Sequence, residues 1–246
     1  MRWPRRFLII IGILMLGPLA IAAGEESRVK AAWRTATRQS AGLAPPAATT
    51  HEAVVQVYAA RAFAWRGVFA VHTWFSLKPE GASAYTTYEV MGWHVFRGGD
   101  ALRIHNGGPD RYWFGNKPDL LADVRGEAAS QAIIDIKKAV ANYPWPGSYR
   151  TWPGPNSNSF TAFVTRRVPA LKVNLPPTAI GKDYISDTTI IGNAPSGSGA
   201  QLSLWGVAGV LISPEEGLEF NLLGLSFGLN PLNFSLRLPG VGIVKP

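Results

Sequence analysis

The sequence predicts an α+β domain that follows an apolar N-terminal helix. Short runs of alternating apolar and polar residues in the first half are typical of strands. Residues 127–142 carry apolar side chains at helical spacing, and Leu/Gly-rich runs near the end again indicate strands. Because Pro/Gly turns connect the early strands, we expect an antiparallel sheet packed with helices.

The N-terminus predicts a membrane segment. Arg2, Arg5 and Arg6 precede residues 7–23, a stretch without a charge. This length is short for a membrane-spanning helix and long for the core of a signal peptide, and small residues at 20–24 would also permit cleavage. We therefore expect residues 1–24 to be a membrane anchor or a signal peptide. The arginines orient the N-terminus toward the cytoplasm, so the bulk of the chain is exported.

Composition excludes several classes of function. The net charge is +8, but no basic stripe suited to nucleic acid occurs. The chain has no cysteine, which excludes disulfides, thiolate metal sites, a cysteine nucleophile and a lipid-modified N-terminal cysteine. The four histidines lack zinc-site spacing, and no glycine motif precedes a helix as a phosphate loop requires. We predict no metal, no cofactor and no nucleic-acid partner.

Along the chain, a juxtamembrane helix over 25–40 and a Pro/Ala/Thr linker over 42–50 precede one globular domain, residues 51–246. Within it we expect strands at 53–59, 68–77, 85–96 and 102–105, helices at 119–124, 127–142 and 156–167, loops over 175–198, and strands at 201–212, 218–229 and 234–238.

Two residues form a candidate catalytic pair. His72 lies in the middle of a strand, and Ser157 lies at a helix start, where a histidine within reach would accept its proton. Glu89 or His94 would orient the histidine. The alternatives are that His72 is a hydrogen-bonded strand residue beside Trp74 and that Ser157 caps the helix.

Neighbouring residues would complete a binding groove. Backbone N–H groups around Asn156 and Asn158 would hold an oxyanion. Tyr112, Trp113, Trp145 and Trp152 would line the groove, or else serve as packing residues.

The order of these elements resembles the circularly permuted papain-like fold, on the residues Val71-His72-Thr73-Trp74 and Asn156-Ser157-Asn158-Ser159-Phe160. In that fold a histidine strand precedes a helix that opens with Asn-Cys. Here Ser157 stands where the cysteine would be, and a serine hydroxyl is far less acidic than a thiol.

A second resemblance covers about residues 51–240. It rests on the segments VVQVYAAR at 54–61, TYEVMGW at 87–93, DRYWFGNKP at 110–118, WPGPNSN at 152–158, PTAIGKD at 177–183 and EGLEFNLLGLSF at 216–227. Together they are similar to the bacterial domain-of-unknown-function family 3750. The resemblance implies a bacterial envelope protein in the inner membrane, with its main domain on the periplasmic side, and implies no activity.

Two functions remain open from the sequence. The first is a membrane-anchored hydrolase or acyl-transferase that acts on cell-wall peptide or lipid amide with Ser157 and His72. The second is an inactive module that binds an envelope ligand or a partner. Separately, residues 201–229 are apolar enough to rest on a membrane, although burial against the first sheet is the simpler expectation.

Overall fold

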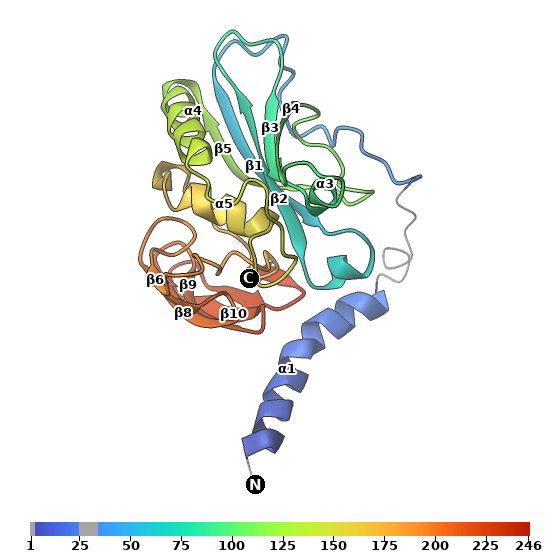
Figure 1. The fold of residues 1–246 in the computed structure, drawn as a ribbon, viewed down its shortest axis with the longest axis vertical. Helices are drawn as coiled ribbons and strands as arrows, with labels where there is room; N and C mark the ends of the chain where they lie inside the picture. Colours follow the sequence, from blue (N-terminus) through green and yellow to red (C-terminus); the bar gives the residue numbers. More distant parts are fainter. Residues whose placement is uncertain (1–2, 25–33) are drawn as a thin grey trace.

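The computed structural model describes residues 3–24 and 34–246 (Figure 1). Helix α1, Trp3–Gly24, projects away from the rest of the chain, and its residues Arg5–Gly24 are long and apolar enough to cross a membrane. The predicted N-terminal apolar helix is thus confirmed. The predicted helix over 25–40 falls partly on residues outside the described ranges, and residues 34–40 form turns and extended backbone.

The first sheet has five antiparallel strands in the order β4-β3-β2-β1-β5. This confirms the α+β class with an antiparallel sheet. Its strands are β1 (Val54–Arg61), β2 (Val71–Lys78), β3 (Thr86–Val90), β4 (Leu102–Asn106) and β5 (Asp119–Arg125).

Two helices cover one face of this sheet. Helices α4 (Gly126–Ala141) and α5 (Ser157–Thr165) bury their apolar sides against alternate strand residues such as Val57 and Phe75. The rings of Phe75 and Phe160 meet edge to face, 6.1 Å apart. Three short helical turns complete this part: α3 (Gly92–Val95), η1 (Ala64–Val68) and η2 (Pro169–Leu171).

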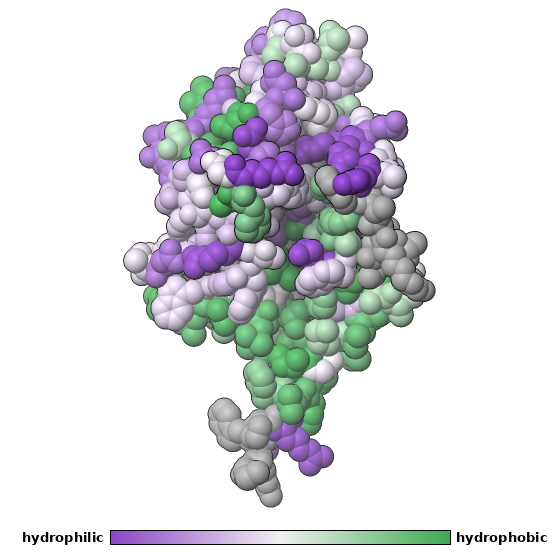
Figure 2. All heavy atoms as spheres, turned by 45° about the vertical axis from the view of Figure 1, so that its right-hand side comes forward, coloured by the Kyte–Doolittle hydropathy of each residue, from purple (hydrophilic) through white to green (hydrophobic). Residues whose placement is uncertain are grey.

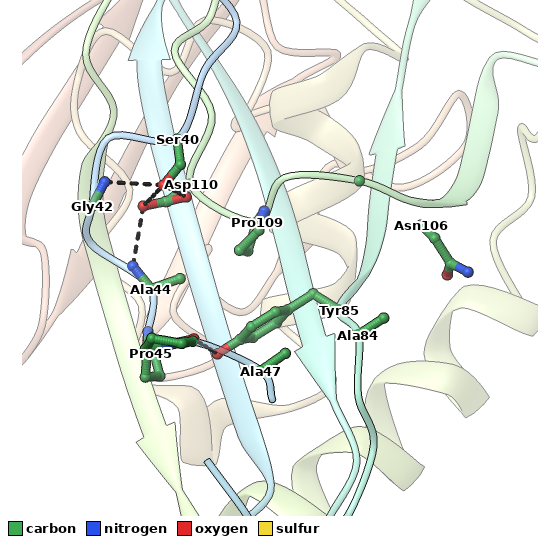
Figure 3. Close-up of a pocket in the computed structure, with 12 residues that line it drawn as sticks. Ser40, Gly42, Ala44, Pro45, Ala47, Ala84, Tyr85, Asn106, Pro109 and Asp110 are labelled. Atoms are coloured by element: carbon green, nitrogen blue, oxygen red, sulfur yellow. Dashed lines mark hydrogen bonds between the residues drawn. The ribbon is translucent and has the colours of Figure 1, made fainter. Parts of the chain in front are cut away.

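Loop segments cover the opposite face of the sheet. Here Tyr58, Trp74 and Trp113 form a second buried cluster. The buried carboxylate of Asp110 accepts hydrogen bonds from the Ser40 hydroxyl and from the backbone N–H of Ala44 (Figure 3). It also accepts one from the backbone N–H of Leu43. The predicted linker is therefore held on the domain, beside a hollow of about 640 Å³.

The second sheet is a seven-stranded meander in the order β12-β11-β10-β9-β8-β7-β6, at the base of the domain in Figure 1. Its strands are β6 (Ile191–Gly192), β7 (Ala200–Leu204), β8 (Ala208–Ser213), β9 (Gly217–Leu222), β10 (Leu225–Asn230), β11 (Ser235–Leu238) and β12 (Gly242–Val244).

Several predicted boundaries were wrong. Residues 119–124 form β5 and not a helix, because they pair along β1. The predicted strand over 85–96 ends at Val90, since Gly92 opens α3 tightly against the ring of Tyr149. The predicted strands over 201–212 and 218–229 are each two strands. Trp205, Gly206, Leu223 and Gly224 have positive φ, which lets each run turn back on itself as a hairpin. Residues 205–207 connect β7 to β8, and residues 223–224 connect β9 to β10.

Candidate functional site

A buried carboxylate gathers three basic side chains on the loop-covered face of the first sheet. Glu89 is fully buried and accepts hydrogen bonds from His72 Nε2 and His105 Nε2, each at 2.8 Å, and from Arg111 Nη2 at 2.5 Å. One Glu89 oxygen takes the His72 bond, and the other takes the bonds from His105 and Arg111. The site therefore combines one anion, one permanent cation and two imidazoles.

The sheet register produces this arrangement. Strands β2, β3 and β4 are neighbours, and side chains on one face recur every second residue. Ser76 pairs with Thr87, and Thr87 pairs with His105, so the alternate residues His72, Glu89 and His105 share one face. Arg111 comes from the covering loop, where its neighbour Tyr112 donates its N–H to Gln39 O at 2.8 Å.

The surroundings of Glu89 and His72 determine the charge states of these two side chains. Burial alone would raise the pKa of Glu89, but the hydrogen bonds from His105 and His72 and the charge of Arg111 outweigh it and hold this pKa below its ordinary value. Burial lowers the pKa of His72, despite its hydrogen bond to Glu89. At neutral pH Glu89 is therefore ionised and His72 is neutral, donating its Nε2 proton to the carboxylate.

A cavity of about 250 Å³ opens beside this cluster; we call it the Glu89 pocket. Its walls are mostly aromatic, and its polar groups come from Glu89, His105 and two arginines. The lining residues are Arg38, Glu89, Met91, Trp93, His105, Arg111, Tyr112, Trp113 and Phe114. Trp113 stacks between His72, at a ring distance of 3.7 Å, and Trp93, at 5.7 Å.

One hydrogen-bond donor in the pocket has no acceptor among the residues that the structure describes. Arg111 uses Nη2 on Glu89, while its buried Nη1 has no hydrogen-bond partner among residues 3–24 and 34–246. The Thr87 hydroxyl and the Gln56 amide nitrogen, on the same face, are also buried without a partner there. A buried donor left without an acceptor is destabilising, so this face is suited to a ligand or water that accepts hydrogen bonds.

The same residues are poorly suited to a metal ion. Two imidazoles and a carboxylate are a common ligand set, but Arg111 already places a positive charge on the Glu89 oxygen that His105 also contacts. Within the described ranges no group of histidine and acidic side chains has metal-site geometry. The pocket therefore favours an anionic group over a cation.

The segment around Ser157 is a helix cap. Asn156 Oδ1 accepts the backbone N–H of Asn158 and Ser159, and Asn156 Nδ2 donates to Thr151 O and Ile180 O. The Ser159 hydroxyl accepts the N–H of Asn156, which completes a capping box. The N–H groups of Asn156, Asn158 and Ser159, which we expected to hold an oxyanion, are thus already bonded within the protein.

His72 and Ser157 lie on opposite faces of the sheet. Thr73, which points away from His72, donates its hydroxyl to Thr161 at 2.8 Å and contacts Ser157 O at 3.3 Å. His72 instead stacks on Trp74 and Trp113. The backbone of β2 therefore separates the expected nucleophile from the expected base.

The other expected site residues do not lie together. Tyr112 and Trp113 line the Glu89 pocket. Asn158 belongs to the cap, where its Nδ2 donates to Val71 O and Ile180 O. His94 lies in α3 and packs on Trp93, and Trp152 packs near Gly224 in the second sheet.

His105, Arg111 and Arg38 belong to the pocket although the sequence did not single them out. Glu89 was considered only as an orienting residue for a pair with Ser157. One sequence pattern could have predicted the role of His105. Thr87 and Glu89 are two residues apart and so lie on one face of their strand, and the next strand along the chain carries His105. The sequence did not predict that Arg38 lies in the pocket, because its position depends on the pairing of residues 37–41 with residues 110–115.

Replacing Asn156 by alanine is expected to lower the free energy of unfolding by about 2 kcal/mol, because it removes an N-cap and leaves buried groups without partners. Replacing Ser157 by alanine is expected to change it by less than about 0.5 kcal/mol, because the side chains that form the cap are those of Asn156 and Ser159. Urea unfolding of both variants measures the difference. Equal losses would contradict the assignment of the cap to Asn156.

The comparisons with known proteins agree with one of the two resemblances. Neither the curated proteins nor the solved structures contain a match to this chain, so the permuted papain-like fold stays a prediction. Residues 52–184, more than half of the chain, match one protein-family profile and include Glu89, His105 and Arg111. The match ends before the second sheet, earlier than the sequence resemblance suggested. The chain therefore belongs to the family described as "Protein of unknown function (DUF3750)".

Proposed function

We propose that this chain is a membrane-anchored envelope protein whose Glu89 pocket binds a small ligand that carries a flat ring and an anionic group. The proposal is the non-enzymatic alternative of the two that the sequence leaves open. The observation that carries it is Arg111 Nη1, a buried donor without a partner among the described residues, at the edge of an aromatic cavity.

The pocket chemistry supports both parts of this ligand. Trp93, Trp113 and Phe114 offer aromatic faces and edges on which a ring packs. Arg111 Nη1 is a buried cationic donor without an acceptor among the described residues, so the anionic group of a ligand would supply its missing hydrogen bond. A volume of about 250 Å³ limits the ligand to a small molecule or to one end of a larger envelope compound, such as a cell-wall fragment or a lipid head group.

The packing of α1 supports an anchor that is retained and not removed as a signal peptide. Leu14 and Pro18, one helical turn apart, are buried against the domain. A side chain at Gly17 would overlap the carbonyl oxygen of Pro239. A helix fitted to the domain in this way is part of its structure. The arginines that precede the apolar part of α1 favour a cytoplasmic N-terminus, which for an inner-membrane protein leaves the domain in the periplasm.

Hydrolysis or acyl transfer by Ser157 and His72 is less well supported. A serine nucleophile needs its base within hydrogen-bond reach and free N–H groups for the oxyanion. The two residues lie on opposite faces of the sheet, and the N–H groups of Asn158 and Ser159 are bonded to Asn156. Binding at the Glu89 pocket needs neither.

The proposal predicts that ring-bearing anions bind and that Arg111 is required. Benzoate and phenyl phosphate are suitable probes, with uncharged benzyl alcohol and cationic benzylamine as controls. The Arg111→Lys variant keeps the charge beside Glu89 but loses the planar fork, so its affinity for the anions is expected to fall about 10–100-fold.

Isothermal titration calorimetry of the full chain in detergent measures these affinities. Tyr149→Phe is the control variant, because Tyr149 packs on the helix-covered side of the first sheet. Its affinity for the anions is expected to equal that of the parent chain. Equal affinity of the parent chain and Arg111→Lys, or a preference for benzylamine, would contradict the proposal.

A further inference from the structure

The second sheet has apolar side chains on its outer face and polar side chains on its inner face, the reverse of an ordinary sheet in a soluble protein. The strand register places only apolar residues on the face that points away from the domain. One row across five strands consists of Ile191, Leu202, Val210, Phe220 and Phe227. A second row consists of Ile212, Leu218, Leu229, Leu236 and Val244. Many of these side chains are exposed, and Ile212 is 64 % exposed.

The inner face of the same sheet is polar and buried. Glu219 is surrounded by Lys182 and Arg237, and all three side chains are at most 1 % exposed. Arg237 also donates to Asn174 and to the backbone of Leu175, and Gln201 donates to Asp183. A sheet whose charges point inward and whose outer face is wholly apolar is fitted to an apolar environment outside the protein.

We propose that the outer face of the seven-stranded sheet rests on the lipid bilayer, in the leaflet that holds the C-terminal end of α1. This inference rests on the proposed role of α1 as a membrane anchor. It adds a second membrane contact, made by the folded domain itself. Figure 2 shows hydrophobic residues gathered at the base of the molecule, with hydrophilic residues toward the opposite end.

The contact between α1 and the sheet sets the depth of this docking. Gly17 and Pro18 pack against the turn between β11 and β12, where a side chain at Gly240 would overlap Pro18. Gly17 lies seven residues before Gly24, the last residue of α1. At a rise of 1.5 Å per residue, the turn lies roughly 10 Å below the end of the helix. If that end marks the membrane surface, the turn reaches the acyl chains of one leaflet.

The sheet lies on the bilayer and does not cross it. Its strands have six residues or fewer, whereas a membrane-spanning strand needs about 9–11. It also has two open edges, β6 and β12, whose unpaired backbone groups are not tolerated in the hydrocarbon core. Amphipathic elements that lie in the interface bury about 5–10 Å of their apolar side, which agrees with the depth set by α1.

A bilayer fits this face better than a second copy of the chain. Protein interfaces usually combine an apolar centre with hydrogen bonds, but this face offers no polar side chain in either row. Its attachment to α1 also brings it to the membrane whenever the helix inserts. A dimer would have to form beside two inserted helices.

Three isoleucines of nearly equal exposure allow a direct test in the full chain. Ile212 lies on the outer face and is 64 % exposed; Ile13 on α1 and Ile134 on α4 are each 60 % exposed. Because the chain has no cysteine, each substitution Ile212→Cys, Ile13→Cys or Ile134→Cys creates a unique site for a fluorescent label. The labelled proteins are reconstituted into phosphatidylethanolamine–phosphatidylglycerol vesicles with brominated acyl chains, which quench only labels in contact with lipid.

The proposal predicts strong quenching at Ile13 and Ile212 and none at Ile134, with iodide in the water quenching Ile134 alone. Lipid quenching at Ile13 but iodide quenching at Ile212 would leave the anchor intact and overturn the docking of the sheet. A label at Ile212 that neither lipid nor iodide quenches would identify an interface between copies and overturn it as well. Absence of lipid quenching at Ile13 would contradict the role of α1 as a membrane anchor. If the label at Ile212 were still quenched by lipid, the sheet would dock on the membrane without α1.

Discussion

Replacing Glu219 by glutamine is expected to lower the free energy of unfolding by about 3–5 kcal/mol, the largest effect that we predict for a single residue. Glu219 accepts from both Lys182 and Arg237 in a region with almost no solvent exposure. Burial would raise the pKa of Glu219, but the charges of Lys182 and Arg237 hold it below its ordinary value. The substitution leaves the two buried cations with one carboxylate, that of Asp183, which forms an ion pair with Lys182.

Urea unfolding at neutral pH, followed by circular dichroism, measures this effect. Glu80→Gln is the matched control, because the ion pair of Glu80 with His51 is solvent-exposed and its loss is expected to change the free energy of unfolding little. If Glu219→Gln unfolded at the same urea concentration as Glu80→Gln, the buried network would not stabilise the second sheet as described.

Replacing Glu89 by glutamine is expected to lower the free energy of unfolding by about 3 kcal/mol at neutral pH. The amide keeps one acceptor oxygen, but its NH₂ group faces donors from His72, His105 or Arg111. Arg111 then remains partly buried without its counter-charge. The same urea experiment measures the loss, again with Glu80→Gln as the control.

The pH dependence of Glu89→Gln provides a second, independent check. The folded-state pKa of Glu89 lies below its ordinary value of 4.5, so its stabilising effect is present above pH 4.5 and is lost as the pH falls below it. The gap between the parent chain and Glu89→Gln should therefore narrow in acid. A gap that stayed constant down to low pH would contradict an ionised, hydrogen-bonded Glu89.

His72 causes a second loss of stability in acid, which begins at a higher pH than the loss due to Glu89. Its folded-state pKa lies below the ordinary value of 6.5, so unfolding takes up a proton as the pH falls below 6.5 and stability decreases. Glu89→Gln should retain this part of the curve, because burial is the main cause of the lowered pKa of His72.

Local sequence patterns predicted the helices α4 and α5 and the general class. Helix α4 lies within one residue of the predicted range, because its apolar residues recur at helical spacing and it needs little help from distant contacts. The cap at Asn156 was also visible, since an asparagine followed by small polar residues is typical of a helix start.

Features that depend on distant pairing were missed. Residues 119–125 form a strand only because β1 lies beside them, and nothing local distinguishes them from a short helix. The turns at Trp205-Gly206 and Leu223-Gly224 were missed because they need positive φ at Trp205 and Leu223. Residues of these types rarely adopt positive φ.

The site was predicted in part. His72, Tyr112 and Trp113 do meet at one place, but the partner of His72 is Glu89 and not Ser157. Which face of a sheet a helix covers cannot be read from a strand sequence whose two faces are both buried, as in β2. The alternation within β2 placed His72 opposite Thr73, and only the packing of α5 on Thr73 decided which of them faces Ser157.

The most direct test of the proposed binding site is a crystal structure of the full chain with phenyl phosphate. The account predicts that a phosphate oxygen lies about 3 Å from Arg111 Nη1, within hydrogen-bond distance, and that the phenyl ring packs on Trp93 or Trp113. A phenyl phosphate bound away from the Glu89 pocket, or a pocket in which Arg111 Nη1 bonds only to water at saturating phenyl phosphate, would contradict it.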